Sequence, residues 1–208
     1  MPVIALVGNK GGAGKTTLSV NLSAGLAKSA KVAVIDADPQ GSALQWNVFT
    51  DSSNAIPFIE AENDLEKQVA DLNGNYDYIV VDCPPSVQSQ QTDQVLRACD
   101  VAIIPVQPSP VDIWATVHIE EAVQNARESN TALKAMLVIN QLEARTTLSK
   151  LVRDAVAEIG LPVASTALRR RAIYRTSALE GKTVFEMGRR GADAADQINE
   201  LIQEIIQL

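Results

Sequence analysis

Cysteine is scarce in this sequence, and long hydrophobic runs are missing from it. The two cysteines among the 208 residues, Cys83 and Cys99, are too few for a disulfide framework, and their spacing matches no zinc pattern. No stretch approaches the roughly 18 consecutive apolar residues of a membrane span. The first residues also carry no basic targeting segment. These absences indicate a reducing compartment and predict a cytoplasmic protein.

An excess of positive charge is also lacking, although the charge is unevenly distributed. The formal net charge is −7, which argues against a protein coated in nucleic acid. The window from residue 165 to residue 191 nevertheless carries +5, so the rest of the chain carries −12. Such an asymmetry fits a local anion-binding face, but it fits equally well a solvated face whose charges pair internally.

Short apolar runs alternate with longer helical patterns along the whole chain. The apolar runs, at residues 3–7, 32–35, 78–81, 101–106 and 135–139, predict strands buried on both faces. Helices are predicted at residues 15–29, 42–49, 64–72, 112–128 and 147–159, and again from about residues 171 and 192. This alternation, without repeats or a Pro/Gly-rich linker, predicts an α/β fold. We expect a mostly parallel central sheet flanked by helices on both faces, in one domain spanning residues 1–208.

A glycine-rich segment that ends in lysine and threonine follows the first predicted strand. It reads Asn9-Lys10-Gly11-Gly12-Ala13-Gly14-Lys15-Thr16-Thr17. Glycines permit the tight turn in which successive N–H groups face an anion, and the following helix N-terminus adds partial positive charge. Lys15 is predicted to reach the outer phosphates of a nucleotide, and the Thr16 hydroxyl to ligate Mg²⁺. The strict phosphate-loop pattern has glycine where this chain has Asn9, and an additional lysine, Lys10, stands beside it.

With this loop, the chain resembles the ParA/MinD family of deviant Walker A ATPases, whose members partition or position cargo. Residues 34–41 resemble the family's switch I, residues 79–86 its Walker B and switch II, and residues 104–108 a further family pattern. The resemblance implies a P-loop NTPase fold, a small ParA-type member, and ATP with Mg²⁺ as cofactors. In that family the additional lysine, here Lys10, reaches across a nucleotide-sandwich homodimer to the other subunit's phosphates.

The nucleotide is expected to contact the loop and one residue outside it. The loop contacts are Lys10, Gly11, Gly12, Ala13, Gly14, Lys15, Thr16 and Thr17. Asn140 ends the fifth predicted strand, and its amide offers one donor and one acceptor to an adenine edge. A turn-forming asparagine fits that position nearly as well.

Three aspartates, Asp36, Asp38 and Asp82, lie at or just past the ends of predicted strands. Open α/β sheets bind ligands at this edge, and a strand-end aspartate can hold Mg²⁺ through its water shell, the role predicted for Asp82. The resemblance implies that Asp38 orients or activates the attacking water and that Asp36 supports the Mg²⁺ shell. Catalysis is thus expected from Asp38 and the two loop lysines, and metal binding from Asp36, Asp82 and Thr16.

The basic window contains four arginines near one predicted helix start: Arg169, Arg170, Arg171 and Arg175. ParA-like proteins bind DNA without sequence preference through basic residues near the C-terminus, so the resemblance implies contacts with nonspecific double-stranded DNA. Some of these arginines could instead pair with Glu180 or Glu186, or lie at a dimer interface. Because the phosphate loop lies elsewhere in the sequence, a charge reversal in this window is expected to change ATP hydrolysis little in the absence of DNA and partner.

The last predicted helix has an apolar stripe and an acidic polar face. The stripe consists of Ile198, Leu201, Ile202, Ile205 and Leu208, at helical spacing. No lysine or arginine follows Arg190, and anionic lipid surfaces repel an acidic face. The stripe is therefore predicted to pack in the core and not on a membrane. Since the phosphate loop begins at residue 9, no room remains for an N-terminal helix-turn-helix, and sequence-specific operator binding is not expected.

These features favour an ATP-dependent partition or positioning ATPase that dimerises with ATP, associates with the nucleoid and segregates or spaces a cargo. The cargo could be a plasmid, a chromosome locus or a protein body such as a carboxysome, and slow hydrolysis is expected to be stimulated by a ParB-like or cargo-adaptor protein. One alternative is a metal-cluster carrier or cofactor-insertion NTPase of the same superfamily, although such proteins usually carry a Cys-x-x-Cys pair that this chain lacks. Another is a metabolic enzyme that activates a small substrate with ATP, as in dethiobiotin synthesis.

Overall fold

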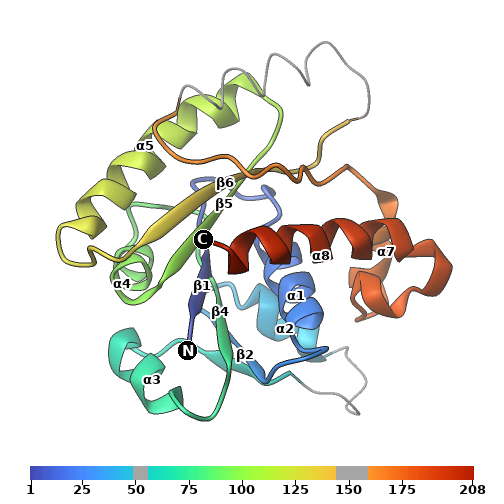
Figure 1. Cartoon of the computed structure of the whole chain (residues 1–208), viewed down its shortest axis with the longest axis horizontal. Coiled ribbons are helices and arrows are strands. Elements are labelled where there is room, and N and C mark those ends of the chain that lie inside the picture. The colour runs from blue at the N-terminus through green and yellow to red at the C-terminus, as the bar shows by residue number, and fades with distance from the viewer. Residues whose placement is uncertain (49–55, 144–158) are drawn as a thin grey trace.

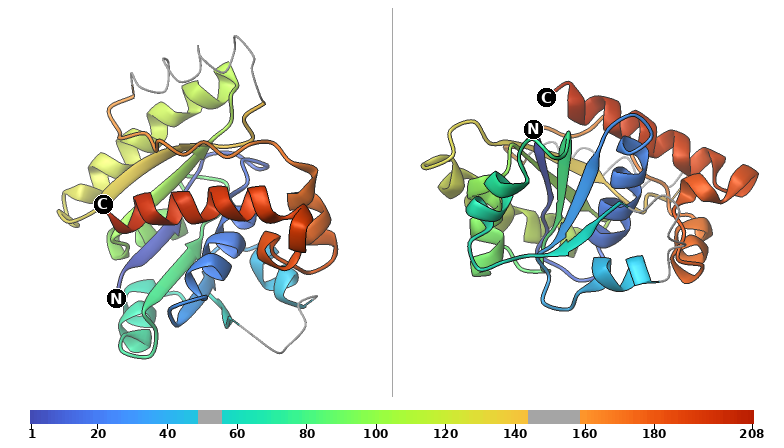
Figure 2. Two further views of the ribbon diagram at one scale, coloured as in Figure 1. Left: turned by 45° about the vertical axis from the view of Figure 1, so that its right-hand side comes forward. Right: turned by 90° about the horizontal axis from the view of Figure 1, so that it is seen from below.

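A parallel sheet of six strands lies between two layers of helices in the computed structural model, which describes residues 1–48, 56–143 and 159–208 (Figures 1 and 2). The strand order is β3-β2-β4-β1-β5-β6, and all neighbouring strands pair in parallel. The strands are β1 (Val3–Leu6), β2 (Val32–Asp36), β3 (Phe58–Glu60), β4 (Tyr78–Asp82), β5 (Val101–Val106) and β6 (Lys134–Ile139). The predicted α/β fold with a parallel central sheet is confirmed.

The strands are apolar throughout because each side of the sheet is covered by its own hydrophobic core. In β1, Val3 and Ala5 belong to one core, whereas Ile4 and Leu6 belong to the other. This is the alternation that successive residues of a strand impose. Both faces are therefore removed from water, which explains why the strands read as continuous apolar runs.

The helices divide between the two faces, as the view from below in Figure 2 shows. One face carries α3 (Leu65–Leu72), α4 (Gln90–Ala98) and α5 (Pro110–Arg127). The other carries α1 (Lys15–Leu26), α2 (Ser42–Val48) and α8 (Ala192–Ile206). Three shorter elements precede α8: α7 (Ala172–Leu179), η2 (Val184–Glu186) and η3 (Gly188–Arg190).

One strand, β3, and one α-helix, α4, were not predicted, nor were the short elements η2 and η3. β3 has three residues, too few to show a period, and α4 has only Val95 and Leu96 as large apolar residues. The start of α4 is fixed by Ser89, whose Oγ accepts a hydrogen bond from the Thr92 N–H at 3.1 Å. The helix predicted at residues 147–159 lies, apart from its last residue, outside the described residues.

The apolar stripe of α8 packs into the core, as predicted. Ile198, Leu201, Ile202 and Ile205 are buried in the hydrophobic core that α8 shares with α1. Among the helices that the structure describes, none combines the length and apolar character that crossing a bilayer requires.

The parallel topology gathers the carboxyl ends of the strands at one edge of the sheet. β2 and β4 are neighbours in a register that pairs Asp36 with Asp82, and β1 lies on the other side of β4. The chain leaves β1 at this edge and returns as α1. The glycine-rich loop and two of the three predicted carboxylates are thus brought together by the sheet itself.

Candidate nucleotide-binding site

The loop between β1 and α1 uses two glycines in conformations that other residues rarely adopt. Gly12 has φ 81° and Gly14 has φ 94°, both in the left-handed region. A Cβ on Gly14 would also lie 2.4 Å from the Nδ2 atom of Asn140. A side chain at Gly14 would therefore strain the backbone and push away a neighbouring residue, which explains the requirement for glycine.

Three side-chain amides from the ends of β5 and β6 hold this loop. The carbonyl of Gly12 accepts hydrogen bonds from Gln107 Nε2 at 2.6 Å and Gln141 Nε2 at 2.9 Å. The carbonyl of Ala13 accepts one from Asn140 Nδ2 at 2.7 Å. The carbonyl and the N–H of a trans peptide point in opposite directions. These contacts therefore point the N–H groups of Ala13 and Gly14 away from the three side-chain amides. That orientation suits an anion held by the loop.

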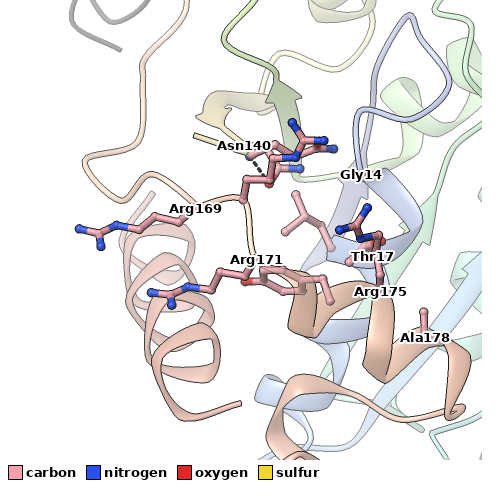
Figure 3. Close-up of a pocket in the computed structure, with 11 residues that line it drawn as sticks. Gly14, Thr17, Asn140, Arg169, Arg171, Arg175 and Ala178 are labelled. Atoms are coloured by element: carbon pink, nitrogen blue, oxygen red, sulfur yellow. Dashed lines mark hydrogen bonds between the residues drawn. The ribbon is translucent and has the colours of Figure 1, made fainter. Parts of the chain in front are cut away.

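Asn140 therefore lies where the sequence predicted it, but with a structural task. Its Nδ2 donates to the Ala13 carbonyl. Its Oδ1 accepts a hydrogen bond from the Gln141 N–H at 2.9 Å (Figure 3). Gln141 itself has φ 58°, which is unusual for a residue with a side chain. Gln107 and Gln141 were not predicted. The only sequence signal for them is their place just past two predicted strands, Gln107 directly after residues 101–106 and Gln141 two residues after residues 135–139.

Lys15 is buried at the start of α1, with 6% of its surface exposed. Its Nζ donates a hydrogen bond to the Lys10 carbonyl at 3.2 Å. Burial lowers the pKa of Lys15, and the nearby charge of Asp82 partly offsets that effect. A buried ammonium group that faces a carbonyl and the loop is suited to binding phosphate oxygens, and this role of Lys15 stays a prediction. Lys10, by contrast, is exposed.

Asp82 is fully buried at the end of β4, and its two carboxylate oxygens differ in their contacts with the described residues. Its Oδ1 lies 3.0 Å from the Ser19 hydroxyl, whereas Oδ2 is buried without a partner. Burial raises the pKa of Asp82 to about 7, although the hydroxyls of Thr16 and Ser19 act in the opposite direction. A buried oxygen without a partner, beside the Thr16 hydroxyl, fits Mg²⁺.

The other ligands of such an ion would come from a nucleotide and from water. Among the described residues, no group of three or more His, Cys, Asp or Glu side chains is arranged to hold a metal. Mg²⁺ commonly uses one or two carboxylates together with phosphate oxygens and waters. Thr16 and Asp82 would hold the ion, which would neutralise charge on the phosphates.

Asp36 holds the switch-like segment after β2 together. Its Oδ1 accepts from the Asp38 N–H at 3.1 Å, and its Oδ2 accepts from Ala43 and Leu44 N–H groups at 2.9 and 3.0 Å. Burial raises the pKa of Asp36, and these N–H groups counter that effect. The carboxylate thus caps the first turn of α2 and positions Asp38, while its predicted support of the Mg²⁺ shell stays a prediction.

Asp38 lies in a turn between β2 and α2, and it is partly exposed. Its Oδ1 accepts a hydrogen bond from the Gln40 N–H at 3.0 Å. Its charge lies close enough to Lys15 to act on the pKa of that lysine. The predicted water-orienting carboxylate therefore stands near the loop at the same edge of the sheet.

A pocket of about 210 Å³ beside the loop brings the arginine window next to the nucleotide site. Gly14, Thr17 and Asn140 line one part of it, and Arg169, Arg170, Arg171, Tyr174 and Arg175 line another (Figure 3). The expectation that this window acts independently of the loop is therefore wrong in its premise. About 150 residues separate the two segments in the sequence, yet chain folding places them around one cavity.

Two of the four arginines are engaged in ion pairs. Arg170 pairs with Glu143 at 2.9 Å and Arg171 with Asp193 at 3.0 Å. Within the described ranges, Arg169 and Arg175 form no ion pair, and both are exposed. Figure 3 shows the guanidinium groups of Arg169 and Arg171 pointing away from Gly14.

The two glutamates considered as partners for these arginines have other contacts. Glu180 pairs with Lys182 at 3.0 Å, and Glu186 accepts hydrogen bonds from the N–H and the hydroxyl of Thr183, each at 2.8 Å. Neither glutamate therefore forms an ion pair with these arginines. Arg169 and Arg175, which are exposed and form no ion pair within the described ranges, are the stronger candidates for phosphate contacts.

The burial of Asp82 predicts a pH-dependent gain in stability for Asp82→Asn without nucleotide or Mg²⁺. The native carboxyl stays protonated up to pH of about 7, whereas the unfolded one ionises near 3.8, so this group destabilises the native protein progressively as pH rises between those values. Asparagine removes that cost. The free energy of unfolding of the variant should exceed that of the wild type by little near pH 4 and by about 2–4 kcal/mol at pH 8. Urea unfolding with a chelator present measures this difference. An equal gain in stability at both pH values would contradict the attribution of that gain to the buried carboxyl of Asp82.

Comparison with known proteins places the chain in a family. A family model described as the CobQ/CobB/MinD/ParA nucleotide binding domain matches residues 4–184. The "Maintenance of carboxysome distribution protein A" of Halothiobacillus neapolitanus is 40% identical over 206 residues, which cover 98% of this chain and 95% of that protein. The sporulation initiation inhibitor protein Soj of Bacillus subtilis is 29% identical over 215 residues, covering 77% of this chain and 83% of Soj.

A solved structure agrees in fold over the full chain. The ATP complex of an aspartate-to-alanine variant of McdA from Cyanothece superposes with a TM-score of 0.82 at 20% identity, covering 100% of this chain and 97% of the other. The glycine-rich loop and the strand-end aspartates indicate a nucleotide site, in agreement with these similarities. The chain belongs to the CobQ/CobB/MinD/ParA family of nucleotide-binding proteins, as a small member of ParA type.

Proposed function

We propose that this chain is an ATP-dependent positioning ATPase of ParA type. The observation that carries the proposal is the convergence of Lys15, Thr16 and Asp82 on a loop whose carbonyls are held by three amides. Such a site supplies what nucleotide hydrolysis requires, namely N–H groups and an ammonium for the phosphates and a hydroxyl and carboxylate for Mg²⁺.

The proposed cycle begins with ATP binding at the loop and ends with release of the dimer from DNA. Lys10, exposed at the rim of the site, would reach the phosphates held by a second subunit and close a homodimer over two nucleotides. Asp38 would orient the attacking water, and an activating adaptor protein would accelerate an otherwise slow reaction. Repeated binding of the ATP-bound dimer to nucleoid DNA, followed by its release after hydrolysis, would then move or space a cargo.

A protein body is the cargo best supported. The relative that is 40% identical over almost the whole of both chains is named for maintaining carboxysome distribution. Relatives named for chromosome partitioning are less similar, for example ParA of Caulobacter vibrioides at 25% identity. We therefore place carboxysome-like bodies ahead of plasmids or chromosome loci.

The alternative of a metal-cluster carrier has less support. Both cysteines are buried within the core, Cys83 at the end of β4 and Cys99 after α4. Thiols in these positions do not present a pair of ligands at a surface between subunits.

DNA binding by the arginine window can be tested by charge reversal. With ATP, the wild-type protein should bind any duplex sequence about equally, and Arg169→Glu or Arg175→Glu should weaken binding most. Each lost phosphate contact should reduce the salt slope by about 0.9. Gel shifts with ATP across a salt series measure both effects. Arg170→Glu and Arg171→Glu complete the set, although each also breaks an ion pair.

The matched control is Arg97→Glu on α4, on the opposite face of the sheet, where Arg97 pairs with Asp93. It changes the net charge equally and should leave DNA binding nearly unchanged. Because the window shares a pocket with Gly14, ATP affinity must be measured for each variant. If all four reversals keep both the affinity and the salt slope, DNA binding belongs to another surface, with Lys182, Arg189 and Arg190 next to be tested.

A further inference from the structure

The buried hydroxyl of Ser19 lies between the helix backbone and the carboxylate of Asp82. Its Oγ is 3.0 Å from the Lys15 carbonyl and 3.0 Å from Asp82 Oδ1. A hydroxyl has one proton, so it can donate to only one of these oxygens at a time. The Lys15 carbonyl already accepts the Ser19 N–H within α1, and Asp82, ionised as a ligand of Mg²⁺ must be, is the stronger acceptor. The proton is therefore assigned to Asp82.

We propose that Ser19 is a positioning residue that holds Asp82 by its Oδ1 and thereby leaves Oδ2 for Mg²⁺. A carboxylate can rotate and exchange its two oxygens, and a fixed donor on one of them removes that freedom. The side chains of Ser19 and Asp82 are both fully buried, so no water replaces the contact from outside. Oδ2 then stays buried without a hydrogen-bond partner among the described residues, on a carboxyl group whose pKa the Thr16 hydroxyl also lowers. This inference rests on the proposed binding of ATP and Mg²⁺ at this site.

Ser23, one turn further along α1, offers a matched control. It is also fully buried, and its Oγ donates to the Ser19 carbonyl at 2.7 Å. Its hydroxyl thus lies against the carbonyl one turn earlier in the helix, as the Ser19 hydroxyl also does. Ser23 forms no hydrogen bond with Asp82. Removing the two hydroxyls separately distinguishes the contact with Asp82 from a general effect on α1.

The test measures binding of a fluorescent ATP analogue to the full chain over a range of Mg²⁺ concentrations. In Ser19→Ala, affinity in EDTA should equal that of the wild type, while the Mg²⁺ concentration needed for half-maximal enhancement should rise about tenfold. Ser19→Cys should behave in the same way because a thiol is a weak donor. Ser23→Ala should match the wild type, and melting temperatures without nucleotide confirm that each variant is folded.

A double variant sharpens the result. If Ser19 acts through Asp82, adding Ser19→Ala to Asp82→Asn should not change the Mg²⁺ requirement further. The inference is overturned if Ser19→Ala has the wild-type Mg²⁺ requirement, if Ser23→Ala shifts it equally, or if Ser19→Ala already loses affinity in EDTA. A wild-type protein that binds no nucleotide with or without Mg²⁺ would instead refute the proposed function, and this inference with it.

Discussion

Lys15→Ala should lower the affinity for ATP about 100-fold or more. The Lys15 ammonium is buried beside the loop, and nothing else among the described side chains occupies its position. Removing one partner of a buried, hydrogen-bonded charge pair costs about 2–5 kcal/mol, because the phosphate oxygens that Lys15 would contact lose their ammonium partner. Calorimetric titration with ATP and Mg²⁺ measures the loss directly.

Lys10→Ala is the matched control for that experiment. It removes an ammonium from the same loop, but an exposed one, so ATP should still bind to a single subunit. The two variants together separate the charge that binds a nucleotide from the charge proposed to reach a second subunit. Undiminished ATP affinity in Lys15→Ala would remove the assignment of the loop as a phosphate-binding site.

Asp38→Ala should keep ATP binding and lower the hydrolysis rate by about 10²–10⁴-fold. The carboxylate is proposed to orient the attacking water, and no phosphate contact depends on it. The ATP-bound dimer should then accumulate and remain on DNA longer than the wild type. Single-turnover hydrolysis with the activating partner, together with a DNA dissociation rate, measures both expectations.

The turn around Asp38 requires a second variant. Since Asp38 Oδ1 accepts the Gln40 N–H, Asp38→Ala also removes a structural hydrogen bond. Asp38→Asn keeps an acceptor at that position but removes the charge. If the carboxylate is catalytic, Asp38→Asn should be as slow as Asp38→Ala. Turnover by Asp38→Asn at the wild-type rate would limit the residue to a role in the turn.

The parts of the site that follow from local sequence were predictable. The glycine-rich loop joins a strand to a helix, and a parallel sheet collects the strand-end residues Asp36 and Asp82 at one edge. Each of these inferences needs only a short segment and the geometry of the fold. The short strand β3 and the polar helix α4 lacked the apolar period on which such inferences depend.

Contacts between distant segments were not predictable, because they depend on how side chains pack. Gln107 and Gln141 reach Gly12 only because β5 lies beside β1 and β6 lies beside β5. Asp36 was expected near Mg²⁺ by resemblance, and the structure shows its Oδ1 bonded to the Asp38 N–H and its Oδ2 to the first turn of α2. Neither the spacing of apolar residues nor the distribution of charge along the sequence indicates these hydrogen bonds.

The pocket that joins Gly14 to Arg169 and Arg175 has a consequence for how this protein could evolve or be engineered. If the arginines bind DNA, a substitution that changes the affinity for DNA also alters the wall of the nucleotide pocket. Natural variation would then change the two affinities together, as one inherited trait. A designer who wants faster diffusion over the nucleoid without altered ATP use would have to work on a basic surface away from this cavity.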